Sequence, residues 1–319
     1  MKWRTAASTI LFHKTLRNVL LLRRGGSAKF MPNMYVFPGG IVEDKIDDQF
    51  PIEKTNFSFV KDQPISIRGF KNDFPLRVAA LRELFEETGI LMVVDDNLAG
   101  KTVLTTSKDK RLRRWREKIR EDPSKFHEFF TDYRLDLHSL QPWSNWLTPS
   151  TYTQRFDTVF FVIPVDREIE VDMCDKEMSG WKWVTPKTIL EKGAEKGKRG
   201  ILAPPQYYEL TRLLNTRFNR LSAMCNPYKM CPQLIIPKED PRKTYEILPG
   251  DHLYENDDEF SSPPREMHES DISKSEVADC VIHRITHFQP NFSRCQLHVK
   301  NVDRESEKIR LFHIERTVN

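Results

Sequence analysis

The chain has 319 residues, of which 39% are hydrophobic and 30% are charged, so a largely disordered chain is excluded and a globular core is expected. The formal net charge is only +4, from 50 Lys and Arg against 46 Asp and Glu, and no nucleic-acid partner is predicted. Five cysteines without a CxxC pair argue against a disulfide framework or a zinc knuckle and favour a reducing, intracellular compartment. No apolar run approaches the roughly 18 residues that cross a membrane.

The N-terminal part of the chain predicts two strands followed by a glycine-containing loop. Residues 5–12 and 18–23 are short apolar runs separated by a polar turn, which is typical of paired strands. The loop that follows ends at Phe37-Pro38-Gly39-Gly40, where two adjacent glycines permit sharp backbone bends. Residues 41–73 are polar and irregular and predict a long loop or insertion.

The strongest helical pattern runs from Leu76 to Met92. Asn72 or Asp73 can cap its start, and Gly89 can end its regular part. Residues 95–150 are highly charged and predict a mainly helical insert, with a lid as one interpretation. Beyond the insert we expect strands at 158–164 and 181–184 and helices at 186–191 and 204–221.

After about residue 240 the composition changes, so residues 241–319 are interpreted as a C-terminal extension. The stretch 255–275 is rich in Asp, Glu, Ser and Pro, which predicts a mobile linker. Residues 281–302 alternate in hydrophobicity and predict a terminal hairpin. His283 and His287 lie four residues apart, but on a strand this spacing does not indicate a metal site, and a structural or surface role is expected.

The predicted helix at 76–92 carries a cluster of acidic residues. Glu83, Glu86 and Glu87 are spaced i, i+3 and i+4, so they fall within one sector of roughly 100°. Leu81, Leu84 and Phe85 occupy the other side and can pack on a sheet. Like charges this close repel. A hard divalent cation reverses that effect, and Mg²⁺ prefers carboxylate oxygen while keeping waters for substrate phosphates. A solvated acidic face is the alternative reading of the glutamates alone.

Two motifs bear on this choice. Arg82-Glu83-Leu84-Phe85-Glu86-Glu87-Thr88-Gly89-Ile90 resembles the helical half of the Nudix box at every specified position, and Phe37-Pro38-Gly39-Gly40 resembles its entry loop. The chain departs from the box in the loop between them, which is about 28 residues longer than usual and places Ile46 where the loop glutamate is expected. That acid is therefore unassigned, with four candidates: Glu43, Asp44, Asp47 and Asp48.

The resemblance implies a Nudix α/β/α sandwich with a mixed sheet, a helical insertion and a C-terminal extension. The Nudix domain would span residues 1–240, with the interrupted box at 37–90. Glu83, Glu86 and Glu87 would bind Mg²⁺ or Mn²⁺, and Arg82, Glu83 and Glu86 would be catalytic, with Arg82 orienting the carboxylates. Glu83, Glu86 or Glu177 would act as general base, although an ordinary exposed glutamate is the alternative for Glu177.

Further segments resemble the branch of coenzyme A and acyl-coenzyme A diphosphatases. They are residues 30–40, 146–149, 155–161 and 203–209. The implied reaction converts coenzyme A to 3′,5′-ADP and 4′-phosphopantetheine. Expected substrate contacts come from Arg23, Arg24, Lys29, Gly39, Gly40 and Arg155. Phe30, Tyr35 or an aromatic residue of the insert are candidates to stack on adenine, with simple packing as the alternative for each. A solvated basic loop is the alternative for the first three cations, and a salt bridge with Asp157 is the alternative for Arg155.

Other functions stay open from the sequence. They are hydrolysis of ADP-ribose or a dinucleotide, a catalytically silent Nudix module that binds a nucleotide, and RNA decapping. The branch suggests a peroxisomal or mitochondrial location, although neither terminus matches a targeting signal. The sequence predicts neither the acyl-chain preference nor the oligomeric state.

Overall fold

The computed structural model of the chain describes residues 3–28, 30–62, 72–95, 100–193, 200–216, 221, 224–226, 228–277 and 279–302. They form two compact units. Unit 1 comprises Met1–Trp3, Ser144–Asp157 and Thr185–Asn319, and unit 2 comprises Arg4–Trp143 and Thr158–Val184. The boundary expected near residue 240 therefore falls inside unit 1. Lys29 and part of the expected helix 204–221 lie outside the described residues.

Unit 2 is built on strands in the order β10-β2-β1-β9, with β3 beside β2 and β4 beside β1. Ile10, Leu11 and Phe12 of β1 are fully buried, as are Leu20, Leu21 and Leu22 of β2, which explains the near-continuous apolar runs in the sequence. The strands predicted at 5–12, 18–23, 158–164 and 181–184 are confirmed. Their bounds are β1 Arg4–His13, β2 Val19–Arg24, β3 Tyr35–Val36, β4 Gly39–Ile41, β9 Phe156–Val165 and β10 Met178–Val184.

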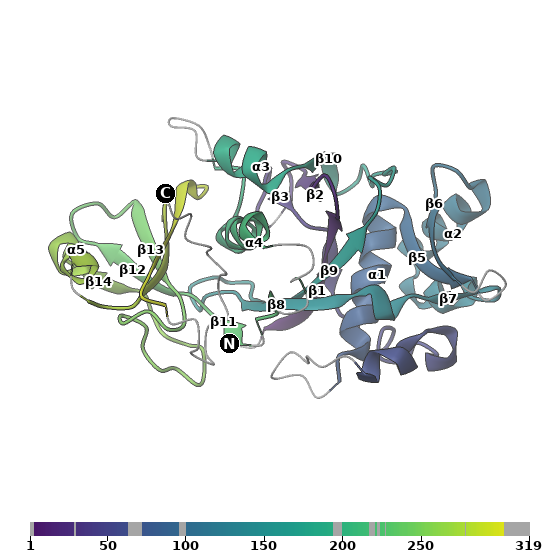
Figure 1. Cartoon of the computed structure of the whole chain (residues 1–319), viewed down its shortest axis with the longest axis horizontal. Helices are drawn as coiled ribbons and strands as arrows, with labels where there is room; N and C mark the ends of the chain where they lie inside the picture. The colour runs from purple at the N-terminus through teal and green to yellow at the C-terminus, as the bar shows by residue number, and fades with distance from the viewer. Residues whose placement is uncertain are drawn as a thin grey trace. The chain divides into compact units, whose positions relative to one another are not determined.

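Helix α1, Phe74–Thr88, carries the glutamates and packs beside β1 (Figure 1). Asn72 accepts the backbone N–H of Phe74 at 3.0 Å, while Asp73 binds Arg77 at 2.8 Å instead of capping the helix. The helix ends at Gly89, whose φ of 71° lies in the left-handed region that favours glycine. The predicted end at Met92 is wrong because Ile90 onward forms a strand.

The segment 95–150 is not mainly helical, which corrects the expectation from sequence. The aliphatic residues after Gly89 form β5, and this strand pairs with β6 and β7 in a separate three-stranded sheet. Only one regular α-helix, α2, lies among the described residues of this segment. The bounds are β5 Ile90–Asp95, β6 Gly100–Thr105, α2 Lys110–Glu121, η3 Pro123–Phe129, β7 Tyr133–Leu135 and η4 Leu137–Ser139. The preceding loop contains η1 Ile52–Lys54 and η2 Phe57–Asp62.

Unit 1 contains a five-stranded sheet in the order β14-β12-β13-β15-β16 and a parallel pair, β8 with β11. The predicted terminal hairpin is confirmed as β15 and β16. The predicted linker at 255–275 instead contains β14, which pairs with β12, and most of α5, whose Ile272 is fully buried. The bounds are β8 Gln141–Leu147, α3 Pro186–Gly193, α4 Pro204–Asn215, β11 Lys229–Met230, β12 Gln233–Pro237, β13 Lys243–Ile247, β14 Arg265–Met267, α5 Glu269–Val277, β15 Ile282–Phe288 and β16 Ser293–Lys300.

Two further sequence expectations can be compared with the structure. His283 and His287 are 0% and 1% exposed on β15, so they are buried structural residues and not surface residues. In the part of the chain that the structure describes, no helix combines the length and the apolar composition of a membrane span.

Candidate active site

The glycine loop lies directly against the acidic helix. The backbone N–H of Gly39 donates to the carboxylate of Glu87 at 2.9 Å. A Cβ atom on Gly39 would collide with the carbonyl of Ala7, and one on Gly40 would collide with the carboxylate of Glu83. Gly39 therefore allows β4 to approach the backbone of β1, and Gly40 leaves room for the carboxylate of Glu83 where it now lies.

Arg82 is the electrostatic centre of the site. It is 1% exposed, and its Nη1 donates to Glu83 at 2.8 Å and to Glu86 at 3.0 Å. Its Nη2 also donates to the carbonyl of Ile41 at 3.0 Å, which ties the helix to the end of β4. One buried guanidinium therefore holds two of the three glutamates.

The structure brings one of the four candidate loop acids to Arg82. Asp47 is fully buried and accepts two parallel bonds, from Nε at 2.9 Å and from Nη2 at 2.9 Å. It also accepts the backbone N–H of Glu43 at 2.8 Å, which fixes the turn. Asp47 lies one residue beyond Ile46, the position that the usual box specifies, so allowing a slip of one residue in the count would have singled it out.

The three glutamates have raised pKa values despite the positive charge of Arg82. Burial raises the pKa of Glu83 to about 7, although Arg82 opposes this shift. Burial also raises the pKa of Glu86, and burial together with the neighbouring Glu83 raises the pKa of Glu87 well above its usual value. Carboxylates with raised pKa values gain most from an added cation.

The donor set fits a hard divalent cation, because carboxylate oxygens are the ligands that Mg²⁺ and Mn²⁺ prefer. Across the described residues, however, no three His, Cys, Asp or Glu side chains already form a metal-binding group. Arg82 holds one carboxylate oxygen each of Glu83 and Glu86, and the Gly39 N–H holds one oxygen of Glu87.

Glu177 lies near the cluster, which the sequence alone left open. Its charge contributes to the raised pKa of Glu87, and its carbonyl accepts the N–H of Gly25 at 2.9 Å. The backbone N–H groups of Asp172 and Cys174 bind carbonyls at the end of α1. Residues 172–177 therefore connect the end of α1 to the start of the loop after β2.

The predicted substrate cations are separated by the geometry of β2. Strand alternation places Arg23 and Arg24 on opposite faces of the sheet. Arg24 acts on Glu87 electrostatically, and its Nε is buried without a hydrogen-bond partner among the described residues. Arg23 is exposed, and it is the strand partner of Tyr35 on β3. The Nζ of Lys182 lies 4.3 Å from the centroid of the Tyr35 ring.

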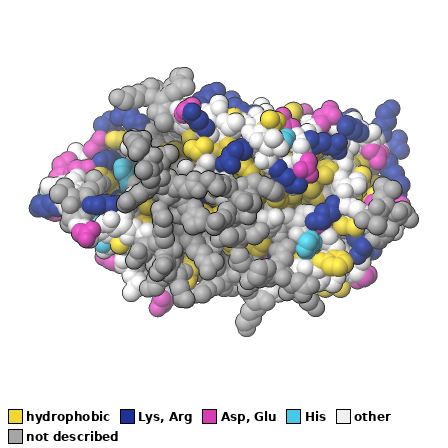
Figure 2. Space-filling model, viewed as in Figure 1, with side chains coloured by type: hydrophobic (Ala, Val, Ile, Leu, Met, Phe, Trp, Pro, Cys, Tyr) yellow, Lys and Arg dark blue, Asp and Glu magenta, His cyan; other side chains and the backbone are white. Residues whose placement is uncertain are grey.

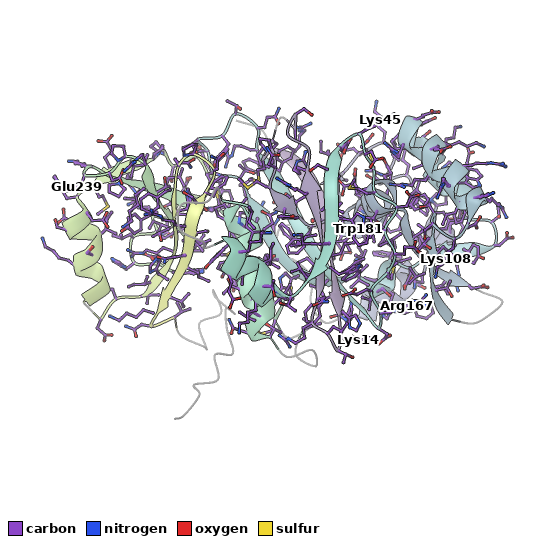
Figure 3. The ribbon with its side chains drawn as sticks, turned by 90° about the horizontal axis from the view of Figure 1, so that it is seen from above. Lys14, Lys45, Lys108, Arg167, Trp181 and Glu239 are labelled. Atoms are coloured by element: carbon purple, nitrogen blue, oxygen red, sulfur yellow. The ribbon has the colours of Figure 1, made fainter. Side chains whose placement is uncertain are left out.

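Trp181 is an aromatic residue that the sequence analysis did not single out as a site residue. It is 41% exposed on β10 (Figure 3) and pairs with Leu22, so it shares a face of the sheet with Arg24. Trp181 and Trp183 alternate along the predicted strand, and this pattern could have indicated that the two rings lie on one face of the sheet.

Arg155 lies in unit 1 and is buried. Its Nε donates to the carbonyl of Thr148 at 2.8 Å and its Nη2 donates to the carbonyl of Phe260 at 2.7 Å. Asp157 binds Lys229 at 2.6 Å and not Arg155. The expected substrate contact is therefore corrected, because the guanidinium is engaged by backbone within its own unit.

Comparison with known proteins agrees with this fold. The crystal structure of a NUDIX hydrolase from Alicyclobacillus acidocaldarius covers 68% of this chain and 93% of its own, with a TM-score of 0.53 and 23% identity. It shows that the fold is the Nudix fold. The family model of the NUDT19 Nudix domain matches residues 44–213, more than half of the chain.

The relatives agree with the family match. A Caenorhabditis elegans protein named as nudix hydrolase 7 is 33% identical over 306 residues, covering 93% of this chain and 89% of that protein. The acyl-coenzyme A diphosphatase NUDT19 of Xenopus laevis is 32% identical over 76% of this chain and 73% of its own. The human NUDT19 is 27% identical over 81% and 82%. The chain therefore belongs to the Nudix hydrolases and, within them, to the family of the NUDT19 Nudix domain, and it is a hydrolytic enzyme.

Proposed function

We propose that the enzyme hydrolyses the diphosphate of coenzyme A or acyl-coenzyme A to 3′,5′-ADP and the corresponding 4′-phosphopantetheine. The names of the Xenopus laevis and human relatives support this substrate class. The observation that carries the chemistry is the cluster of Glu83, Glu86 and Glu87, closed by the Gly39–Gly40 backbone and oriented by Arg82.

In this proposal Glu83, Glu86 and Glu87 hold Mg²⁺ or Mn²⁺. Such an ion, when bound, supplies charge neutralisation at the diphosphate and lowers the pKa of a coordinated water. The chain itself fixes the carboxylates before substrate arrives. Arg82 and the Gly39 N–H hold them on one side of α1, and Asp47 locks Arg82 in place.

Glu177 is our proposed general base, with Glu83 and Glu86 as the alternatives. It would take a proton from the attacking water as the water oxygen bonds to one phosphorus and the bridging oxygen leaves with the other phosphate. Its proximity to Glu87 supports this role, because the metal-binding carboxylates lie where the diphosphate is cleaved.

Arg24 is our proposed ligand of the diphosphate. Its buried Nε has no partner among the described residues, and a diphosphate oxygen beside Glu87 would provide one. Arg23 would read the 3′-phosphate from the opposite face, together with Lys29. Trp181 offers an exposed ring on the Arg24 face on which adenine can stack.

A panel of diphosphates with Mg²⁺ or Mn²⁺, analysed by product mass, tests the function. We expect coenzyme A or its acyl esters to be cleaved fastest, with release of 3′,5′-ADP. Faster cleavage of ADP-ribose or a dinucleotide would replace the proposed substrate. Tight nucleotide binding without any turnover would identify a silent module.

We also propose a peroxisomal or mitochondrial location, which rests on the sequence resemblance alone. Imaging of the tagged full chain against organelle markers tests it, and a diffuse cytosolic distribution would contradict it.

A further inference from the structure

The end of helix α1 is held by two segments far apart in sequence. Helix ends leave carbonyls without intrahelical partners. Here the carbonyl of Glu86 accepts Nε and Nη2 of Arg116 at 3.0 and 2.9 Å. The carbonyls of Glu87 and Thr88 accept the backbone N–H groups of Cys174 and Asp172 at 3.0 and 2.9 Å. The last turn of the catalytic helix is therefore fixed by α2 and by residues 172–174.

Three arginines on one side of α2 converge on this junction. Arg113, Arg116 and Arg120 follow i, i+3 and i+7 spacing, which places them along one face. The first two lie 3.5 and 3.4 Å from the carboxylate of Asp172, and Arg120 donates to the sulfur of Cys174 at 2.8 Å. Thr106 adds a bond to Asp172 at 2.8 Å.

Arg116 differs from the other basic residues of α2 by its burial. Arg116 is 5% exposed between the buried side chains of Leu112 and Ile119, and desolvation lowers its pKa. By contrast, Lys and Arg side chains lie on the surface in many places (Figure 2), and Arg114 and Lys118 of α2 are exposed. A buried guanidinium is costly unless it is fully paired, so its bonds to the end of α1 and to Asp172 explain its place. A cation at a helix C-terminus is also favourable.

The segment 172–178 is attached at both ends and carries Glu177. Asp172 and Cys174 bind α1, while the carbonyl of Glu177 accepts Gly25 N–H and Met178 begins β10. The carbonyl of Cys174 also accepts the backbone N–H groups of Glu177 and Met178, at 3.4 and 3.1 Å, so the residue that binds the end of α1 directly supports the turn that carries Glu177.

We propose that Arg116 is a positioning residue for catalysis, which acts with Asp172 to hold segment 172–178 against the end of α1 and so sets the place of Glu177. The inserted helix α2 thereby serves the active site as a brace. This inference rests on the proposed role of Glu177 in diphosphate hydrolysis.

A double-mutant cycle on kcat tests the coupling. With the best diphosphate substrate, Arg116→Gln and Glu177→Gln are each expected to lower kcat by about 10-fold or more, with KM changed less than about 3-fold. The kcat of the double variant should lie within about 2-fold of the kcat of the slower single variant, because both changes remove the same positioned base. Arg116→Lys should recover part of the loss. Multiplicative losses would overturn the inference.

The matched control is Arg114→Gln, which removes the same charge from an exposed position on the same helix and should leave kcat unchanged. If Arg116→Gln does not fold, Asp172→Asn replaces it in the cycle, since it weakens the same junction while keeping the backbone bonds.

Amide hydrogen exchange tests the junction without any turnover. In Arg116→Gln or Asp172→Asn, the amides of residues 172–178 should exchange at least about 10-fold faster, while those of residues 76–82 keep their protection. Unchanged exchange at 172–178 would overturn the inference even if the enzyme proves active. Absence of turnover in the unmutated chain would refute the proposed function. The exchange rates at residues 172–178 would then still show whether Arg116 and Asp172 hold this segment against α1.

Discussion

At the scale of single residues, Asp47 shows what the sequence could not decide. The lengthened loop left four acids as candidates, and the structure distinguishes them: Asp47 is buried on Arg82, whereas Asp48 is exposed. We expect Asp47→Asn to lower the free energy of unfolding by about 3 kcal/mol, because the buried guanidinium of Arg82 loses its fully buried, two-bond carboxylate partner. Turnover should fall as well. The matched Asp48→Asn should change stability by less than about 0.5 kcal/mol. Chemical denaturation of both variants measures the contrast, and equal effects would remove Asp47 from the site.

Arg23 and Arg24 allow a second comparison at this scale, since they differ mainly in the face of β2 on which they lie. Arg24→Gln should raise KM by about 10-fold for coenzyme A and for its 3′-dephospho form alike, because it contacts the shared diphosphate. Arg23→Gln should affect coenzyme A alone. Steady-state kinetics with the two substrates provides the test. An indistinguishable pattern in the two variants would contradict the division of roles between the faces.

At the scale of elements, local patterns predicted what depends on local contacts. The runs in β1, β2 and β9 and the glutamate face of α1 were visible because their periodicity is a property of consecutive residues. The sheet formed by β5, β6 and β7 was missed because Val93 pairs with Leu135, a partner supplied only by folding. Arg155 was misassigned for a related reason: it donates to two backbone carbonyls and to the sulfur of Cys231, partners that only folding brings together.

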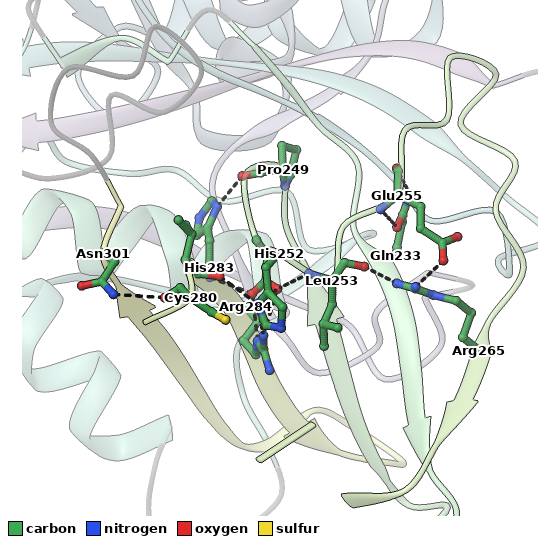
Figure 4. A network of polar contacts seen from close by, with 12 residues as sticks. Gln233, Pro249, His252, Leu253, Glu255, Arg265, Cys280, His283, Arg284 and Asn301 are labelled. Atoms are coloured by element: carbon green, nitrogen blue, oxygen red, sulfur yellow. Dashed lines mark hydrogen bonds and ion pairs between the residues drawn. The ribbon is translucent and has the colours of Figure 1, made fainter. Parts of the chain in front are cut away.

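The sheet of unit 1 carries a pH-sensitive contact on β15. His283 is fully buried, and Figure 4 shows its bond to the carbonyl of Pro249, at 2.7 Å. A carbonyl only accepts, so Nδ1 carries the proton and Nε2 accepts from Tyr208 at 3.0 Å. The neutral ring thus satisfies both partners, and burial lowers the pKa of His283 to about 4.

The sign of the pH dependence follows from this depressed pKa. The unfolded chain binds a proton near pH 6.5 and the folded chain only near pH 4, so stability is fully present above pH 6.5 and falls as the pH drops through that window. The expected slope from this group is about 1.4 kcal/mol per pH unit. His283→Gln should flatten the curve of unfolding free energy against pH between 6.5 and 5, while replacing the exposed His268 by Gln should not. If the slope is unchanged in His283→Gln, His283 is not the source of the pH dependence of the unfolding free energy.

At the scale of the whole molecule, composition predicted a globular protein with a near-neutral charge balance, and it could not place the division of the chain. The two units interleave in sequence, because Met1–Trp3 and Ser144–Asp157 belong to unit 1 while the intervening residues belong to unit 2. The reaction we propose draws its residues from unit 2 alone, since Arg24, Asp47, Arg82, the three glutamates and Glu177 all lie there.

The central claim is that the carboxylates of α1 form a metal-dependent hydrolytic centre. It is tested most directly by release of 3′,5′-ADP from coenzyme A across a range of Mg²⁺ concentrations, in the unmutated enzyme and in Glu87→Gln. We predict Mg²⁺-dependent release by the former and a loss of at least about 100-fold in kcat in the latter at saturating Mg²⁺. The fold should persist, because the neutral amide relieves repulsion with Glu83. Near-normal, Mg²⁺-independent turnover by Glu87→Gln would contradict the claim.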